Sequence, residues 1–284
     1  MKMNIKQAAE QKDKLFIEEK MIWLKKQLEK SRISFVDDRE VIIINRERIL
    51  EESFDAFQSM IELNLNKELQ IYFIGEKAQD AGGVQREWMN LLIQKLFEKH
   101  EGMFMLTKNK KEGNKYVFGQ NVHKHLQWFY FTGQVIGKAL YDDVQVQFPL
   151  SNSVYQFMIN KDYQVTLCDL IHYDEDLYRS FKYMLDDNMS SEDILSLETY
   201  FTIDIQDEKG KTIDTRELKE GGKDIQVTNE NKEEYVFLFV NHLLNENFKL
   251  AQETFLEGFH SVIHPQYLKI FIDGEELRYI LEGP

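Results

Sequence analysis

The segment GEKAQDAGGVQREW, Gly75–Trp88, joins a strand pattern to a helix pattern through a stretch with two adjacent glycines. The preceding residues 70–74 (QIYFI) are rich in β-branched and aromatic side chains, which favours a strand. Gly82 and Gly83 lack a Cβ atom and predict a backbone turn. Apolar residues then recur at i, i+4 and i+7 from Val84, which predicts the start of a helix. This order of strand, turn and helix supplies no chemistry by itself.

Composition and charge restrict the class of protein. The chain has 284 residues, of which 43% are hydrophobic and 13% aromatic, so it can bury a substantial core. Its formal charge of -14 opposes binding to nucleic acid or to an anionic membrane. The sequence contains no apolar run of membrane-spanning length and no secretory signal pattern. The single cysteine excludes an internal disulfide and fits a cytoplasmic or nuclear location.

Helix patterns dominate the larger part of the chain. Residues 41–45 (VIIIN) predict a short strand, and residues 126–141 predict a helix. Gly133 and Gly137 lie one turn apart in that helix, so another backbone can approach it closely. The segment is no phosphate-binding loop, because only three residues, not four, separate its glycines and no Ser or Thr follows the lysine. These glycines therefore indicate packing.

The sequence pattern changes from about residue 163, where short, acid-rich segments begin. A helix pattern covers 177–185 and a β-like run covers 200–205. We therefore expect an α+β fold that is mainly helical. A large subdomain is expected to combine 1–162 with 232–284, and a small subdomain to span 163–231.

Candidates for catalytic or metal chemistry are few. Cys168 has no Lys or Arg nearby in sequence, which makes it a poor nucleophile, although His172 lies one helical turn away and keeps a thiol enzyme open as an alternative. His123 and His125 could share one side of a strand, but no third ligand motif accompanies them. The sequence thus predicts no catalytic residue, no metal site and no cofactor.

Several ordered motifs resemble those of one family. Besides Gly75–Trp88 they are GQVIGKAL (133–140), VTNENKEEYV (227–236), QETFLEGF (252–259) and EELRYILEG (275–283). Together they resemble the HECT-type ubiquitin-protein ligases, in the order of that family's amino-terminal lobe, and most closely the very large members. The resemblance implies a HECT-domain N-lobe with a large helical subdomain and a small subdomain that binds a ubiquitin-conjugating enzyme.

The resemblance also implies the role of the chain. The full-length ligase is a transferase that accepts ubiquitin as a thioester on a cysteine of its carboxy-terminal lobe. That lobe is absent from this sequence, so the chain alone is expected to be inactive and to dock the charged conjugating enzyme. Ubiquitin is a further expected partner, and protein substrates are expected to bind regions outside this chain.

The docking groove implied by the family pattern consists of six residues. They are Leu177, Phe181, Leu197, Thr199, Tyr235 and Phe239. Two i, i+4 pairs in this set each present one side of a helix. We hypothesise that Phe181 and Tyr235 anchor a loop of the conjugating enzyme. The alternative is that all six are ordinary core residues of a non-catalytic helical protein-interaction domain.

Overall fold

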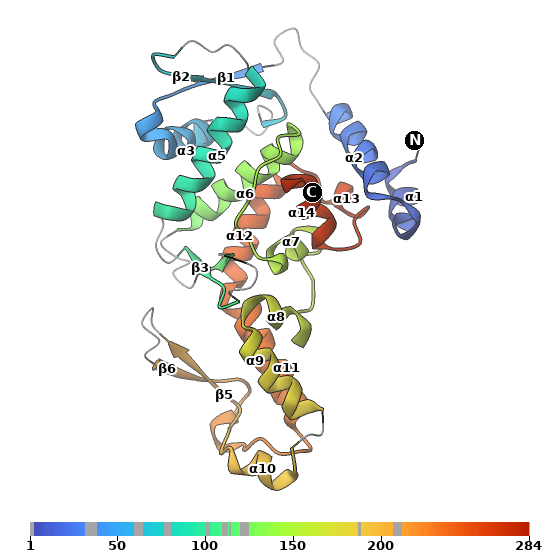
Figure 1. Cartoon of the computed structure of the whole chain (residues 1–284), viewed down its shortest axis with the longest axis vertical. Helices are drawn as coiled ribbons and strands as arrows, with labels where there is room; N and C mark the ends of the chain where they lie inside the picture. The colour runs from blue at the N-terminus through green and yellow to red at the C-terminus, as the bar shows by residue number, and fades with distance from the viewer. Residues whose placement is uncertain are drawn as a thin grey trace. The chain divides into compact units, whose positions relative to one another are not determined.

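The computed structural model divides the chain into two compact units, drawn with its elements labelled in Figure 1. It describes residues 3–31, 39–59, 65–76, 81–99, 103–109, 113, 115–119, 125–186, 189–206 and 212–283. The larger unit comprises Met1–Met105, Tyr116–Asp162 and Leu250–Pro284, and the smaller one comprises Leu106–Lys115 and Tyr163–Lys249. The smaller unit thus extends past the expected boundary at 231.

The larger unit holds most of the helices. They are α1 (Ile5–Glu10), α2 (Ile17–Ser31), α3 (Ile49–Ser59), α5 (Ala81–Lys99), α6 (Leu126–Tyr141), α7 (Asn152–Ile159), α12 (Lys249–His260), α13 (Pro265–Leu268) and α14 (Gly274–Glu282), with the 3-10 turns η1 (Lys12–Lys14) and η2 (Arg46–Arg48). Among the described residues its strands form two pairs, β1 (Arg39–Ile44) with β2 (Glu68–Phe73), and β3 (Phe104–Leu106) with β4 (Tyr116–Phe118). The fold is therefore α+β and mainly helical, as expected. No helix among the described residues is long and apolar enough to cross a membrane.

Strands β1 and β2 confirm the two strands predicted from their apolar runs. They pair in parallel, with Ile42 opposite Ile71 and Ile44 opposite Phe73. These four side chains are at most 5% exposed, and they lie on one face because side chains alternate along a strand. Helix α3 connects the two strands, as a parallel pair requires.

The adjacent glycines lie inside a helix instead of a turn. Helix α5 begins at Ala81, so Gly82 and Gly83 form its first turn. The turn occurs earlier, where Gly75 has a φ of +83°, a conformation that glycine adopts without strain. Residues 77–80 of the same motif lie outside the described residues.

Helices α6 and α12 cross with their backbones in contact. A Cβ atom on Gly133 of α6 would lie 2.0 Å from the carbonyl oxygen of Phe255, and one on Gly258 of α12 would lie 1.9 Å from that of Tyr130. Only glycine fits at these two positions. The close approach expected at Gly133 is therefore confirmed, and α12 is the helix that makes it.

A buried polar network explains the lysine of the GQVIGKAL motif, residues 133–140. Lys138 is fully buried, and its ammonium donates to the carboxylate of Asp142 at 2.7 Å and to the carbonyl oxygen of Lys67. Gln85 on α5 donates to the other oxygen of that carboxylate at 2.8 Å. Because each buried charge has a partner, the network joins three segments at little electrostatic cost.

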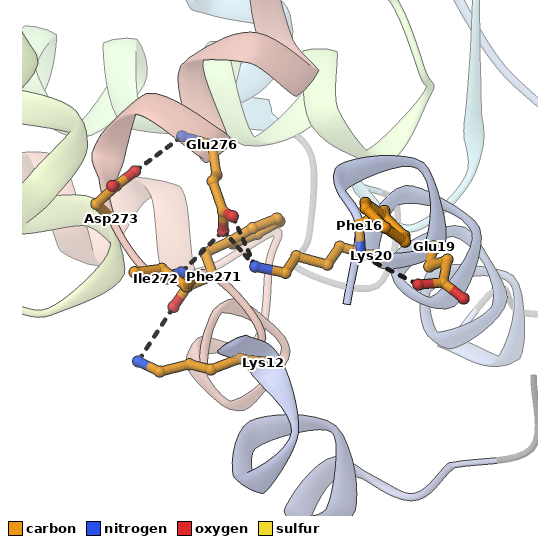
Figure 2. A network of polar contacts seen from close by, with 8 residues as sticks. All are labelled: Lys12, Phe16, Glu19, Lys20, Phe271, Ile272, Asp273 and Glu276. Atoms are coloured by element: carbon orange, nitrogen blue, oxygen red, sulfur yellow. Dashed lines mark hydrogen bonds and ion pairs between the residues drawn. The ribbon is translucent and has the colours of Figure 1, made fainter. Parts of the chain in front are cut away.

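An ion pair fastens α2, near the start of the chain, to α14 (Figure 2). Lys20 is fully buried, and its ammonium lies 2.6 Å and 2.7 Å from the two carboxylate oxygens of Glu276. The same carboxylate accepts the N–H of Ile272 at 2.8 Å. On the preceding turn, Lys12 donates to the carbonyl oxygen of Phe271 at 3.5 Å.

The smaller unit contains helices and one antiparallel strand pair. Its elements are η5 (Leu167–Asp169), α8 (Leu170–Tyr173), α9 (Glu175–Leu185), α10 (Ser191–Ser196), β5 (Thr202–Gln206), β6 (Thr212–Glu217), η6 (Gly222–Asp224), α11 (Lys232–Leu244) and η7 (Glu246–Phe248). Helices α9 and α11 run side by side in Figure 1. This contact groups α11 with the smaller unit, although the sequence-based division assigned 232–284 to the large part.

Candidate functional site

Helix α9 presents two of the predicted residues on one side. Its N-cap is Asp174, whose carboxylate accepts the N–H of Leu177 at 3.0 Å. Glu175 and Asp176 follow in the first turn, where the helix dipole favours negative charge. Phe181 lies one turn after Leu177 and is only 5% exposed, whereas Leu177 is half-buried.

Helix α11 presents the second pair. The buried ammonium of Lys232 in its first turn donates to the carbonyl oxygen of Met184 at 2.9 Å, which fastens the start of α11 to the last turn of α9. Tyr235 is 5% exposed and Phe239 is half-buried. The two helices therefore hold both predicted pairs in one place.

Three of the six predicted residues form an aromatic cluster between α9 and α11. The ring of Phe181 lies edge-to-face with those of Tyr235 and Phe239, at centroid distances of 6.1 Å and 5.1 Å. Tyr235 and Phe239 are 5.8 Å apart. Such arrangements are favourable for aromatic rings beyond the area that they bury. The cluster gives the two helices a defined spacing.

Phe201 is a fourth member that the sequence-based set omits. It is fully buried and lies edge-to-face with Tyr235 at 5.5 Å. Its N–H donates to the carbonyl oxygens of Gly222 and Ile225, at 3.1 Å each. The alternating apolar residues of 200–205 indicated a buried side for this run, but not the partner against which it packs.

The last two predicted residues lie on the segment between α10 and β5. Leu197 is 47% exposed, and the half-buried Thr199 accepts the N–H of Val227 at 2.8 Å. Two further apolar residues, Leu195 in the last turn of α10 and Tyr200 on this segment, are 43% and 39% exposed. The segment therefore offers exposed apolar surface that the sequence-based set only partly included.

Exposed acidic groups lie on two helices of the smaller unit. Glu192 and Asp193 are exposed on α10, and Glu233 and Glu234 are exposed in the first turn of α11. Burial raises the pKa of the Tyr235 phenol to about 12, and the negative charge of Asp204 acts in the same direction. Both influences disfavour the phenolate, so Tyr235 stays neutral over the physiological range.

Replacing Tyr235 by Phe is expected to protect the fold at high pH. The folded-state pKa of about 12 exceeds the ordinary value of 10.0, so the stability that depends on the neutral phenol is fully present below pH 10 and is lost as the pH rises through 12. Between those values the wild-type chain should lose roughly 2 kcal/mol of unfolding free energy relative to Tyr235→Phe. Urea unfolding at several pH values measures this difference, and parallel stability curves would contradict it.

The thiol alternative gains no support from the geometry. Cys168 is exposed on η5, and His172 follows on α8. The residue directly after the thiol is Asp169, whose carboxylate accepts the hydroxyls of Tyr163 and Thr166, each at 2.8 Å. A nucleophilic cysteine needs a cationic neighbour instead.

The structure describes only one residue of the histidine pair. His123 lies outside the described residues, and His125 is the N-cap residue of α6. Within the part of the chain that the structure describes, no group of three His, Cys, Asp or Glu side chains could hold a metal ion.

Known proteins that match this chain are ubiquitin ligases. It is 33% identical to "E3 ubiquitin-protein ligase UPL1" of Arabidopsis thaliana over 274 residues, which cover 91% of this chain. It is 34% identical to "E3 ubiquitin-protein ligase TOM1" of Saccharomyces cerevisiae over 248 residues, which cover 85% of this chain. In each case the match spans 7% of the length of the relative.

The sequence pattern of one family matches most of the chain. It is described as "HECT-domain (ubiquitin-transferase)" and covers residues 90–284, a region that includes α6, α12 and the whole aromatic cluster. The chain therefore belongs to the HECT-domain family of ubiquitin transferases.

Proposed function

We propose that this chain is the amino-terminal lobe of a HECT domain and that its smaller unit docks a ubiquitin-conjugating enzyme charged with ubiquitin. The observation that carries the proposal is the cluster of Phe181, Tyr235 and Phe239 beside exposed apolar residues. Cys168 is the only cysteine of this sequence and lies in no transfer motif. The acceptor cysteine therefore belongs to a part of the ligase outside this chain.

The chemistry assigned to the complete ligase is thioester exchange. The thiolate of the acceptor cysteine attacks the thioester carbonyl of ubiquitin, and the cysteine of the conjugating enzyme leaves as a thiolate. The neutral amine of a substrate lysine then attacks the new thioester carbonyl, which forms an amide bond, releases the acceptor cysteine as a thiolate and frees a proton from the amine. The role of the chain is to raise the effective concentration of the charged enzyme next to the acceptor.

Burial assigns different roles to five of the six residues. Phe181 and Tyr235, each 5% exposed, form the floor of the docking surface. The half-buried Leu177 and Phe239 and the exposed Leu197 provide the area that a partner side chain can reach. In this proposal an apolar side chain of the partner contacts Phe239, and the two floor residues keep that ring in place.

The charge of the chain favours a partner with basic residues near its apolar contact. The formal charge is -14, and exposed acids lie on α10 and in the first turn of α11, the helix that carries Tyr235 and Phe239. Such complementarity raises the association rate more than the affinity. A small interface of this kind is typical of transient encounters, with dissociation constants of about 1 μM or weaker.

Phe239→Ala is expected to weaken binding of a conjugating enzyme by about tenfold or more, because truncation removes the accessible ring of the docking surface. The measurement is a fluorescence titration of the labelled chain with a panel of conjugating enzymes. Phe237→Ala is the matched control, since Phe237 lies on the same helix, is 55% exposed and points to a different side. It should leave the dissociation constant unchanged.

Two results would contradict the proposal. Equal loss of affinity in both variants would show that the site is not the aromatic cluster. A folded wild-type chain that binds no enzyme of the panel would favour the alternative, a non-catalytic helical protein-interaction domain. Melting temperatures of both variants separate loss of binding from loss of folding.

A further inference from the structure

Lys219 lies between the aromatic cluster and the first turn of α11. Its ammonium stands 3.9 Å above the ring centroid of Phe201 and 2.7 Å from a carboxylate oxygen of Glu234. The Lys219 side chain is 29% exposed and that of Glu234 is 52% exposed. An ion pair this accessible adds little to global stability. The position of the Lys219 ammonium, in contrast, is defined by two contacts, one with the Phe201 ring and one with the Glu234 carboxylate.

Both partners of Lys219 adjoin Tyr235. Phe201 packs edge-to-face on Tyr235 at 5.5 Å, and Glu234 is the residue directly before it. The ammonium therefore contacts both the ring that packs on Tyr235 and the side chain of the residue that precedes Tyr235 in α11. Attraction of the cation to the face of the ring keeps Phe201 in the orientation that supports Tyr235.

The other side of Phe201 is fixed by backbone. A Cβ atom on Gly222 would lie 2.4 Å from the carbonyl oxygen of Phe201, so these two backbone segments are in contact there. The N–H of Leu218 donates to the same oxygen at 2.8 Å. These contacts hold the backbone of Phe201. The polar group that contacts its ring is the ammonium of Lys219.

We propose that Lys219 is a positioning residue of the docking surface: by bridging Phe201 and Glu234, it sets the placement of Tyr235 and, through it, of the accessible ring of Phe239. This proposal rests on the proposed docking function. It adds to it a residue that contacts no partner and acts through the aromatic cluster.

The direction in which Lys219→Met changes the dissociation constant separates a positioning role from a purely electrostatic one. Lys219→Met keeps an unbranched apolar side chain over Phe201 but removes one positive charge from an already acidic surface. If only charge mattered, the variant would bind a basic partner more tightly. Positioning predicts the opposite, a dissociation constant raised about fivefold, within the range seen for residues that act through others.

The experiment compares three variants with the wild-type chain. Lys219→Met removes the bridge, Lys219→Arg retains a cation that can both stack and pair, and Lys223→Met makes the same change of charge at an exposed lysine that forms no ion pair within the described residues. The readouts are the dissociation constant for a conjugating enzyme, the melting temperature and the NMR shifts of the Tyr235 and Phe239 rings. The expected result is weaker binding and displaced ring signals for Lys219→Met, with recovery in Lys219→Arg and no change in Lys223→Met.

The outcomes distinguish this proposal from the docking function itself. Unchanged ring signals and unchanged affinity in Lys219→Met overturn the positioning role while docking stands. Tighter binding in Lys219→Met also overturns it, in favour of charge alone. If the wild-type chain binds no enzyme, the docking function fails, and the ring signals then show only whether Lys219 orders the cluster.

Discussion

Gly258→Ala is expected to lower the free energy of unfolding by about 3 kcal/mol or more, a large share of the total stability of a typical domain. The added Cβ atom would lie 1.9 Å from the carbonyl oxygen of Tyr130 and 2.7 Å from its carbonyl carbon. These are backbone atoms of α6, so they cannot rotate away as a side chain would. The two helices must separate, which disrupts the packing along their whole contact. Urea unfolding followed by circular dichroism measures the loss.

The sign of this prediction is informative. On an exposed helix face the same substitution stabilises by up to about 1 kcal/mol, because alanine favours the helix over glycine. A stability equal to or above that of the wild type would therefore contradict the close crossing. Glu257→Ala, at the neighbouring exposed position, is the control and should change stability by less than about 0.5 kcal/mol.

A double variant tests whether the two glycines belong to one crossing. Gly133 faces the carbonyl oxygen of Phe255 at 2.0 Å from its hypothetical Cβ atom, so Gly133→Ala is expected to force the same separation of α6 and α12. Once one substitution has moved the helices apart, the second costs less. The loss in Gly133→Ala/Gly258→Ala should be smaller than the sum of the single losses, whereas additive values would indicate independent sites.

Glu276→Leu is expected to destabilise the chain by about 3–5 kcal/mol, because it leaves a buried ammonium without its counterion. Lys20 is fully buried and has both carboxylate oxygens of Glu276 within 2.7 Å (Figure 2). The substitution also removes the acceptor of the Ile272 N–H. Thermal and urea unfolding measure the loss, and a loss below about 1 kcal/mol would contradict it.

Two comparisons isolate the cause. Lys20→Met/Glu276→Leu replaces both charges by apolar side chains and should recover most of the stability, since an apolar pair can substitute for a buried ion pair. Lys25→Met breaks a pair with Asp143 that has a similar distance, 2.6 Å, but side chains that are 47% and 52% exposed. That pair should contribute at most about 1 kcal/mol. Equal losses from the buried and the exposed pair would show that burial is not the deciding factor.

Local periodicity determined the elements of this protein and part of its candidate site. The apolar runs before Gly75 and around Ile43 predicted β1 and β2, and the helix pattern of 126–141 predicted α6, because these preferences act within a few neighbouring residues. The i, i+4 spacing of Tyr235 and Phe239 likewise placed both rings on one side of α11. The ordered motifs added the family, which the match over 90–284 confirms.

Contacts between distant segments were decided by the tertiary structure alone. The aromatic cluster gained Phe201 because the Gly222 segment holds the Phe201 backbone while its ring packs on Tyr235 of α11. Lys20 met Glu276 across 256 positions of sequence, and Gly258 met Tyr130 only because two helices cross. Periodicity describes which side of an element is apolar, but it contains no information about which other element covers that side. That choice depends on the packing of the whole unit, so the sequence showed which residues could be buried and only the fold showed against what.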